Sequence, residues 1–239
     1  MPGFASKPSP ARLAVTAGIV LLTTLAAGAA EKRYGPGVSD SEIKLGQTMP
    51  YSGPASGYAS VGLTEAACIK MLNEQDGING RKIALISLDD GYSPPKTVEQ
   101  TRRLVEDEKV LAIFGSLGTA ANSSIQKYLN QRKVPQVFIS TGATKWGDPE
   151  HFPWTMGWAP NYQLEARIYA RYIQQHIDKA RIAVLYQNDD YGKDYVKGFR
   201  DGLGEAAAKL IVAQTSYEIS DATVDSQIVA LQSSDATSF

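Results

Sequence analysis

The sequence predicts an α/β protein with two lobes, each built on a doubly wound parallel sheet, and the second lobe is incomplete. Apolar runs with β-branched residues alternate with helical patterns at intervals of about 25 to 35 residues, as in successive βαβ units. Of the 239 residues, 43% are hydrophobic and 21% are charged, which is ordinary for a globular protein. The formal net charge of −1 gives no indication of a nucleic-acid partner.

The hydrophobic periodicity predicts strands alternating with helices along the whole chain after its first thirty residues. The predicted strands span residues 43–49, 82–88, 110–115, 134–140, 181–187 and 210–216. The predicted helices span residues 58–74, 95–107, 120–131, 162–177, 193–208 and, for a partial last helix, 223–232. The right-handed crossover rule then places the helices on both faces of the sheets.

Residues 151–161 interrupt this alternation with two prolines, two tryptophans and no helical period, and we interpret them as a crossing between lobes. The predicted division is a signal peptide at 1–29, an N-terminal lobe at 30–155 and the start of a second lobe at 156–239. A doubly wound lobe needs about four strands to bury both faces of its sheet, and the second lobe has only two. We therefore expect a chain truncated at its C-terminus.

The first thirty residues have the layout of a secretory signal peptide. Lys7 and Arg12 precede an apolar run over residues 13–27, and small residues follow at 28–30. We expect cleavage after Ala29 or Ala30, and export of the mature protein. An uncleaved membrane anchor is the alternative, although the run is short for a span. No cysteine directly follows the run, which excludes a lipoprotein anchor.

The stretch 110–124 is predicted to form the central strand, turn and helix of the first lobe. Its apolar start is typical of a strand buried on both faces, and the following helix turns Ile125, Tyr128 and Leu129 inward. Thr119 is predicted to cap this helix, whose first-turn N–H groups favour an anion such as a carboxylate. A plain turn and helix cap is the alternative. The turn lacks the lysine of a phosphate-binding P-loop.

Polar, glycine-rich loops follow the first, third and fourth predicted strands. They span residues 51–58, 116–119 and 141–144. Ligands of open α/β sheets bind at the carboxyl ends of the strands, so these loops are expected to converge on one polar anchor. Each loop taken alone is equally compatible with ordinary helix capping.

Three aromatic residues, Tyr58, Trp146 and Tyr191, stand at loop positions on the same side and are candidate walls for a ligand. Packing in a lid or in the core is the alternative interpretation for each.

The sequence offers no catalytic or metal-binding constellation. The pairs Asp89-Asp90 and Asp189-Asp190 follow strands, but neither has a histidine or a third carboxylate at suitable spacing. The single cysteine, Cys68, excludes an internal disulfide, and we expect it to be buried in a helix. We therefore expect no enzyme activity, no metal and no cofactor.

Six short motifs in order along the chain resemble the substrate-binding proteins of ABC transporters, of the Leu/Ile/Val-binding type. They are Ser52-Gly53-Pro54 with Tyr58, the run 76–83, Asp89-Asp90, the run 115–119, the run 141–144 and Asp190-Tyr191-Gly192. The set covers residues 43–230. The resemblance implies the type I periplasmic-binding-protein fold, with two lobes that close on a ligand.

The resemblance also implies the roles of individual residues. The ligand carboxylate would be held by Thr119 and by the loop Gly142, Ala143 and Thr144, and the ligand would contact Tyr58 and Tyr191. In the family, the acidic residue that takes an amino acid's ammonium lies beyond the end of this sequence.

The implied function is capture of an amino acid or another small carboxylate-bearing ligand in the periplasm, followed by delivery to the permease subunits of an ABC importer. The membrane would be contacted only through the permease. The stretch 143–148 resembles a branch that includes binders of aromatic acids, so an aromatic or other non-amine acid is an alternative ligand. A sensor ectodomain and an exported α/β enzyme are further alternatives.

Overall fold

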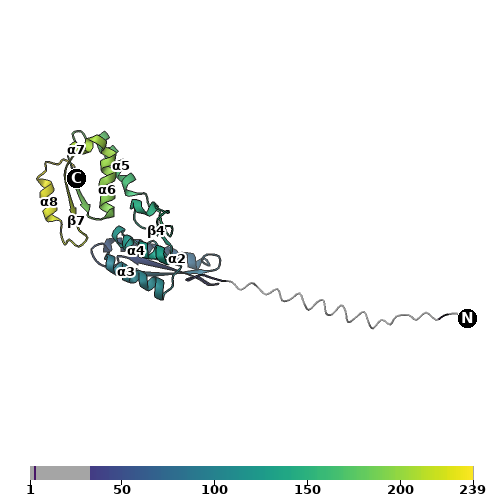
Figure 1. Cartoon of the computed structure of the whole chain (residues 1–239). Coiled ribbons are helices and arrows are strands. Elements are labelled where there is room, and N and C mark those ends of the chain that lie inside the picture. The colour runs from purple at the N-terminus through teal and green to yellow at the C-terminus, as the bar shows by residue number, and fades with distance from the viewer. Residues whose placement is uncertain (1–2, 4–32, 239) are drawn as a thin grey trace. The chain divides into compact units, whose positions relative to one another are not determined.

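A five-stranded parallel sheet organises the N-terminal part of the described chain, residues 42–157 (Figure 1). The computed structural model describes Gly3 and residues 33–238, and the chain from Gly35 onward forms one compact unit. Apart from Gly3, the predicted signal peptide and its cleavage site lie outside the described residues. No helix among the described residues is both long enough and apolar enough to cross a bilayer.

The strands of this sheet are arranged in the order β2-β1-β3-β4-β5, and every neighbouring pair is parallel. Their bounds are β1 Glu42–Met49, β2 Lys82–Asp89, β3 Ala112–Phe114, β4 Gln136–Ile139 and β5 Thr155–Gly157. The chain runs from β1 to an edge strand, β2, and then to β3 on the other side of β1. The topological switch point therefore lies between β1 and β3, where α/β sheets place their ligands.

Three helices connect these strands: α2 Ala59–Glu74, α3 Pro94–Arg102 and α4 Thr119–Arg132. The short η2 Ser56–Tyr58 precedes α2, and a π-helical turn, η3 Arg103–Asp107, continues α3. Two prolines open α3, where the missing N–H groups cost no hydrogen bond. The core lies between the sheet and the packed pair α3 and α4, around the fully buried Leu104, Ile113 and Leu129.

A second sheet pairs β6 Ile182–Gln187 with β7 Ile211–Tyr217 in parallel. Its helices are α5 Tyr162–His176, α6 Asp190–Leu203, α7 Ala207–Leu210 and α8 Asp225–Gln232, with η5 Gly204–Ala206 before α7. Asn161 and Asp189 cap α5 and α6 with their side-chain oxygens. A Cβ atom added to Gly198 would lie 2.3 Å from the Gln163 carbonyl oxygen, so α5 and α6 pack at very close range.

The predicted elements are confirmed with shifts of a few residues, with two exceptions. The predicted helix at 193–208 is divided into α6, η5 and α7, because Gly204 has a φ of 59°. The other exception is β5, which was not predicted. This three-residue strand lies inside the stretch interpreted as an irregular crossing, and it pairs with β4. The sequence of this strand has no strand periodicity, and hydrogen bonds to β4 stabilise it instead. One of them runs from Gln136 N–H to the Trp154 carbonyl (2.7 Å). The predicted division after residue 155 cuts this strand.

The pairing of β4 with β5 shifts register between Val137 and Ile139. Phe138 is the residue between them; it has a φ of 54°, in the left-handed region, and its side chain is exposed. It packs on Phe114 of β3, with ring centroids 5.5 Å apart. A bulge therefore stands two residues before Ser140, where the loop after β4 begins.

Three local expectations are wrong. Thr119 does not cap α4: the cap residue is Gly118, no side chain caps the helix, and Thr119 is its first helical residue. Cys68 is exposed, because α2 buries only Gly62 among its residues. Trp146 is not a loop-side wall; it is buried in a small cluster with Ile139.

Candidate functional site

The loops at the switch point border a cavity of about 620 Å³, which we call the hydroxyl cavity. Pro54 comes from the loop after β1, Gly118 from the turn after β3, Thr119 from the start of α4 and Thr141 from the loop after β4. The predicted convergence of these three loops is therefore confirmed. Six tyrosines also line the cavity: Tyr58, Tyr92, Tyr162, Tyr191, Tyr195 and Tyr217.

A connected row of hydroxyl groups lies along the cavity. Thr119 and Thr141, only 2% and 5% exposed, share a hydrogen bond between their Oγ1 atoms. Thr141 Oγ1 also lies 2.9 Å from Tyr162 Oη. Each hydroxyl can both donate and accept, and its proton can rotate toward a new acceptor. A carboxylate placed beside this row could thus receive hydrogen bonds without a cation.

The first turn of α4 adds backbone donors beside the row. Gly118 has a φ of 100°, and a Cβ atom there would lie 2.6 Å from the Tyr92 ring. Glycine is therefore required where the chain enters the helix. Asn122 N–H donates to the Gly118 carbonyl (3.0 Å) as the first intrahelical bond, and the N–H groups before it have no carbonyl one turn earlier in the helix. Together with the helix dipole they favour an anion.

The tyrosines form packed walls and retain their protons. Tyr162 stacks on Tyr195 with ring centroids 4.8 Å apart, and it meets the edge of Tyr191 at 5.0 Å. Burial raises the pKa of Tyr92 to about 12 and the pKa of Tyr191 to about 12. At neutral pH these phenols are therefore uncharged hydrogen-bond donors.

The charged side chains among the described residues that line the cavity are acidic. Glu218 and Asp221 belong to the segment after β7, and no lysine, arginine or histidine lines this cavity. Glu218 Oε1 accepts a hydrogen bond from Asn188 Nδ2 (2.6 Å), and Asp221 Oδ2 accepts one from Glu218 N–H (2.8 Å). The cavity therefore combines neutral donors at one wall with carboxylates at another.

Of the predicted site residues, Tyr58, Thr119 and Tyr191 line the hydroxyl cavity. Gly142, Ala143 and Thr144 do not line it.

Each of these three loop residues has another environment. Gly142 accepts a hydrogen bond from Tyr162 N–H (2.8 Å), and a Cβ atom there would lie 2.3 Å from the Pro160 carbonyl oxygen. Ala143 is buried beside Trp146. Thr144 is exposed, at the start of η4 Thr144–Gly147, and its N–H donates to Asp194 Oδ2.

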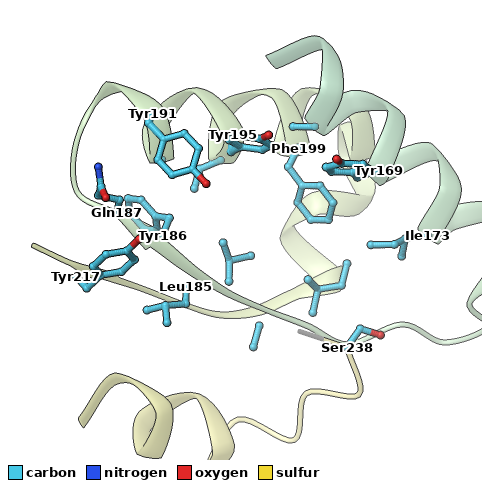
Figure 2. A pocket seen from close by; sticks show the side chains of 16 residues that line it. Tyr169, Ile173, Leu185, Tyr186, Gln187, Tyr191, Tyr195, Phe199, Tyr217 and Ser238 are labelled. Carbon is cyan, nitrogen blue, oxygen red and sulfur yellow. The ribbon is translucent and has the colours of Figure 1, made fainter. Parts of the chain in front are cut away.

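A second cavity of about 440 Å³ lies between α5, α6 and β6, and Figure 2 shows its walls. Tyr169 and Ile173 come from α5 and Phe199 from α6, while Leu185 comes from β6. No charged residue lines this apolar cavity among the described residues. It shares Gln187, Tyr191, Tyr195 and Tyr217 with the hydroxyl cavity, so an apolar space adjoins the polar one.

The aspartate pairs have structural roles. Partial burial raises the pKa of Asp89, but hydrogen bonds from Lys96 and Ser52 outweigh it and hold that pKa well below its usual range. Asp90 is fully buried, which raises its pKa, and it accepts hydrogen bonds from Thr97 and Tyr92. No group of histidine, cysteine or carboxylate side chains in the described part of the chain is arranged to hold a metal.

The sequence interpretation missed several residues of the cavity. Tyr92 follows β2, while Tyr217, Glu218 and Asp221 lie at the end of β7 and just after it. The rule that favours the carboxyl ends of strands would have pointed to both segments, had it been applied to these strands as well.

The sequence profile of the periplasmic binding protein family matches residues 42–239. Leu/Ile/Val-binding protein homolog 7 of Brucella abortus is 25% identical over 228 residues, and the alignment covers 89% of this chain and 55% of that protein. The chain spans about half the length of the curated relatives it matches.

Solved structures show the same architecture. A substrate-binding periplasmic protein from Ralstonia solanacearum superposes with a TM-score of 0.73 and 28% identity, over 81% of this chain and 54% of that one. A solute-binding protein of an ABC transporter from Rhodopseudomonas palustris BisB5, solved in complex with 3,4-dihydroxybenzoic acid, gives a TM-score of 0.68 and 19% identity, over 83% and 54%. These likenesses confirm the predicted α/β fold with parallel sheets.

Proposed function

Because the chain belongs to the periplasmic binding protein family, whose members are non-enzymatic transport proteins, we propose that it captures a small carboxylate-bearing ligand for an ABC importer. The bound ligand is handed to a permease with two transmembrane subunits and two ATPases. The site of action is the periplasm, reached through the predicted signal peptide. Catalysis by the aspartate pairs is not part of this function.

The observation that carries the proposal is the row of hydroxyls formed by Thr119, Thr141 and Tyr162 beside the first turn of α4. This row offers several neutral donors to a carboxylate at the switch point of the sheet. A hydrogen bond to a charged group stabilises binding by roughly 1.5–3 kcal/mol, so two or three such bonds suffice for firm anchoring.

We propose an amino acid as the ligand. Among the described residues the cavity is lined by Glu218 and Asp221 and by no cation, so a zwitterion with an ammonium group suits its charge better than a simple anion does. The Leu/Ile/Val-binding name of the Brucella relative supports this choice. The adjoining apolar cavity offers room for an aliphatic or aromatic side chain.

An aromatic acid without an ammonium is the second candidate. The six tyrosines of the hydroxyl cavity favour it, because aromatic rings pack edge-to-face or stacked on a planar ligand. The bound dihydroxybenzoate of the Rhodopseudomonas protein is an example in the same fold.

Closure of two lobes on the ligand is part of the proposal. We place the division between the lobes after Gly157, so that β5 remains with the five-stranded sheet.

The test is calorimetric titration with ligand pairs that differ only in the ammonium group. Leucine is compared with 4-methylpentanoate, and phenylalanine with 3-phenylpropanoate. We expect the amino acid of a pair to bind more tightly. Preference for the acid that lacks the ammonium would replace the amino-acid assignment by the aromatic or other non-amine acid. Chemical conversion of a bound ligand would overturn the transport function.

A further inference from the structure

Gln187, the last residue of β6, lies where the two cavities meet. It lines both the hydroxyl cavity and the apolar cavity, and it is only 7% exposed. Figure 2 shows it at the end of the apolar cavity where Tyr191 and Tyr217 also lie. The described residues that both cavities share are this glutamine and three tyrosines, so its amide stands among phenols at the junction.

The nitrogen of this amide is bonded to the protein. Gln187 Nε2 donates to Asp189 Oδ2 (2.7 Å), and the reverse orientation would set the amide oxygen against a carboxylate. The side chain also hydrogen-bonds to Tyr92, and this bond lowers the pKa of the phenol, although burial raises it more. A bond that lowers the pKa of a phenol is one donated to its oxygen, so the glutamine is the donor here as well. Both N–H groups of the amide are therefore used.

Asp189 holds the amide in a fixed orientation. Its side chain is half-buried, and its Oδ1 accepts a hydrogen bond from Gly192 N–H (3.1 Å) as the cap of α6. One carboxylate oxygen thus fastens the helix and the other fastens the amide nitrogen. A charged acceptor behind the nitrogen also polarises the amide, which makes its oxygen a stronger acceptor.

The carbonyl oxygen of Gln187, Oε1, is the group of this amide that is left for a ligand. It accepts no hydrogen bond from the part of the chain that the structure describes. A ligand that places an N–H or O–H group here satisfies the oxygen. A ligand that places a methyl group here buries the oxygen without a partner, which weakens binding.

This oxygen and the hydroxyl row are close enough for one small ligand to reach both. A Cβ atom at Gly118 would lie 2.6 Å from the Tyr92 ring, and the hydroxyl of the same ring meets the Gln187 amide. A single phenol ring therefore bridges the distance from the start of α4, where Thr119 lies, to the amide. An amino acid or a hydroxybenzoate carries its carboxylate and its donor at comparable separations.

We propose that Gln187 is a specificity-determining residue, whose carbonyl oxygen accepts a hydrogen bond from an N–H or O–H donor of the ligand while Asp189 holds the amide nitrogen. The inference rests on the proposed function, since it concerns the same bound ligand. In an amino acid the donor is the ammonium group, and in an aromatic acid it is a ring hydroxyl.

The experiment is calorimetric titration with ligand pairs of similar shape in which one member lacks the donor. Leucine is paired with 4-methylpentanoate, phenylalanine with 3-phenylpropanoate, and 4-hydroxybenzoate with 4-methylbenzoate. In the wild type we expect the donor-bearing member of the pair that binds to have the lower dissociation constant. The amino-acid pairs report an ammonium as the donor, and the benzoate pair reports a hydroxyl.

Two variants test the residue and its support. Gln187→Met keeps the length of the side chain and removes the oxygen, and it should weaken the donor-bearing member about tenfold while leaving the other member unchanged. Asp189→Asn can still cap α6, but it no longer offers a carboxylate to the amide nitrogen. The amide can then turn over, so this variant should lose a smaller part of the same preference.

The matched control is Gln126→Met, the same change at a buried glutamine that lines neither cavity, and it should keep the preference of the wild type. The comparison within each pair is a second control, because a general loss of structure weakens both members. Equal weakening of both members by Gln187→Met overturns the inference. Tighter wild-type binding of the donor-free member in every pair overturns it as well.

Failure of the proposed function gives a different result. If no member of any pair binds the wild type, the transport function fails and the inference fails with it. If the pairs bind and Gln187→Met keeps the wild-type preference, the inference alone fails.

Discussion

Thr119→Val removes one hydroxyl from the row and keeps the shape of the side chain. In the free protein the variant loses the hydrogen bond to Thr141, and Thr141 keeps its partner Tyr162 at 2.9 Å. The expected loss in the free energy of unfolding is about 1 kcal/mol. In the complex, a lost hydrogen bond to a carboxylate costs roughly 1.5–3 kcal/mol, about a ten- to hundredfold loss of affinity.

The assay is calorimetric titration with whichever member of the ligand pairs binds the wild type, together with urea unfolding followed by circular dichroism. Thr101→Val is the matched control: Thr101 is fully buried and its hydroxyl has no hydrogen-bond partner. This control should bind like the wild type. Unchanged affinity in Thr119→Val would refute the assignment of the hydroxyl row as the carboxylate anchor.

Further predictions concern the frame that holds the site. Gly118→Ala places a methyl group 2.6 Å from the Tyr92 ring at a φ of 100°, and it should lower the free energy of unfolding in urea by about 1–3 kcal/mol. Gly198→Ala, 2.3 Å from a carbonyl oxygen of α5, should cost a similar amount, about 1–3 kcal/mol, in the same measurement. The folded-state pKa of Asp89 is lowered, so its stabilising effect is full above the unfolded pKa of about 4 and is lost as pH falls toward the folded value. Urea unfolding at successive pH values should therefore show that Asp89→Asn has a lower free energy of unfolding than the wild type at pH 7 and loses less of it as the pH falls. Lys96→Ala removes one hydrogen bond to Asp89, so it should also lower the free energy of unfolding at pH 7 and flatten its decline in acid.

Each of these predictions can be contradicted independently of the others. Full stability of Gly118→Ala would mean that Tyr92 moves away at no cost. Full stability of Gly198→Ala would mean that α5 and α6 can separate slightly. An acid limb of Asp89→Asn that parallels the wild type would mean that Asp89 has an ordinary pKa in the folded protein.

The strands and helices could be predicted from the sequence because each is a local pattern. A buried parallel strand such as β3 lies in a continuous apolar run, residues 110–114, and α5 has a clear helical period with a capping Asn161. β5 could not be predicted, because three residues carry too little periodicity. Its formation depends on hydrogen bonds to β4, a neighbour in the sheet that is separated from it in the sequence.

The candidate site could be predicted only at the level of loops. The rule of strand ends correctly brought Thr119 and Tyr58 to one cavity. It could not indicate that Thr144 would face Asp194, because that contact joins residues fifty positions apart. The exposure of Cys68 was equally hidden, because α2 has no strongly apolar face to set its orientation.

Because of the bulge at Phe138, the position of the Ser140 and Thr141 hydroxyls in the cavity depends on the number of residues in β4. Side chains alternate between the two faces of a strand, so removing one residue from β4 would turn Ser140 and Thr141 to opposite faces. Insertions and deletions are thus far more harmful here than substitutions. Over evolution, the ligand preference of the site is expected to change through substitutions in the segment from β4 to its loop, while the length of this segment stays constant. Designed variants should keep that length as well.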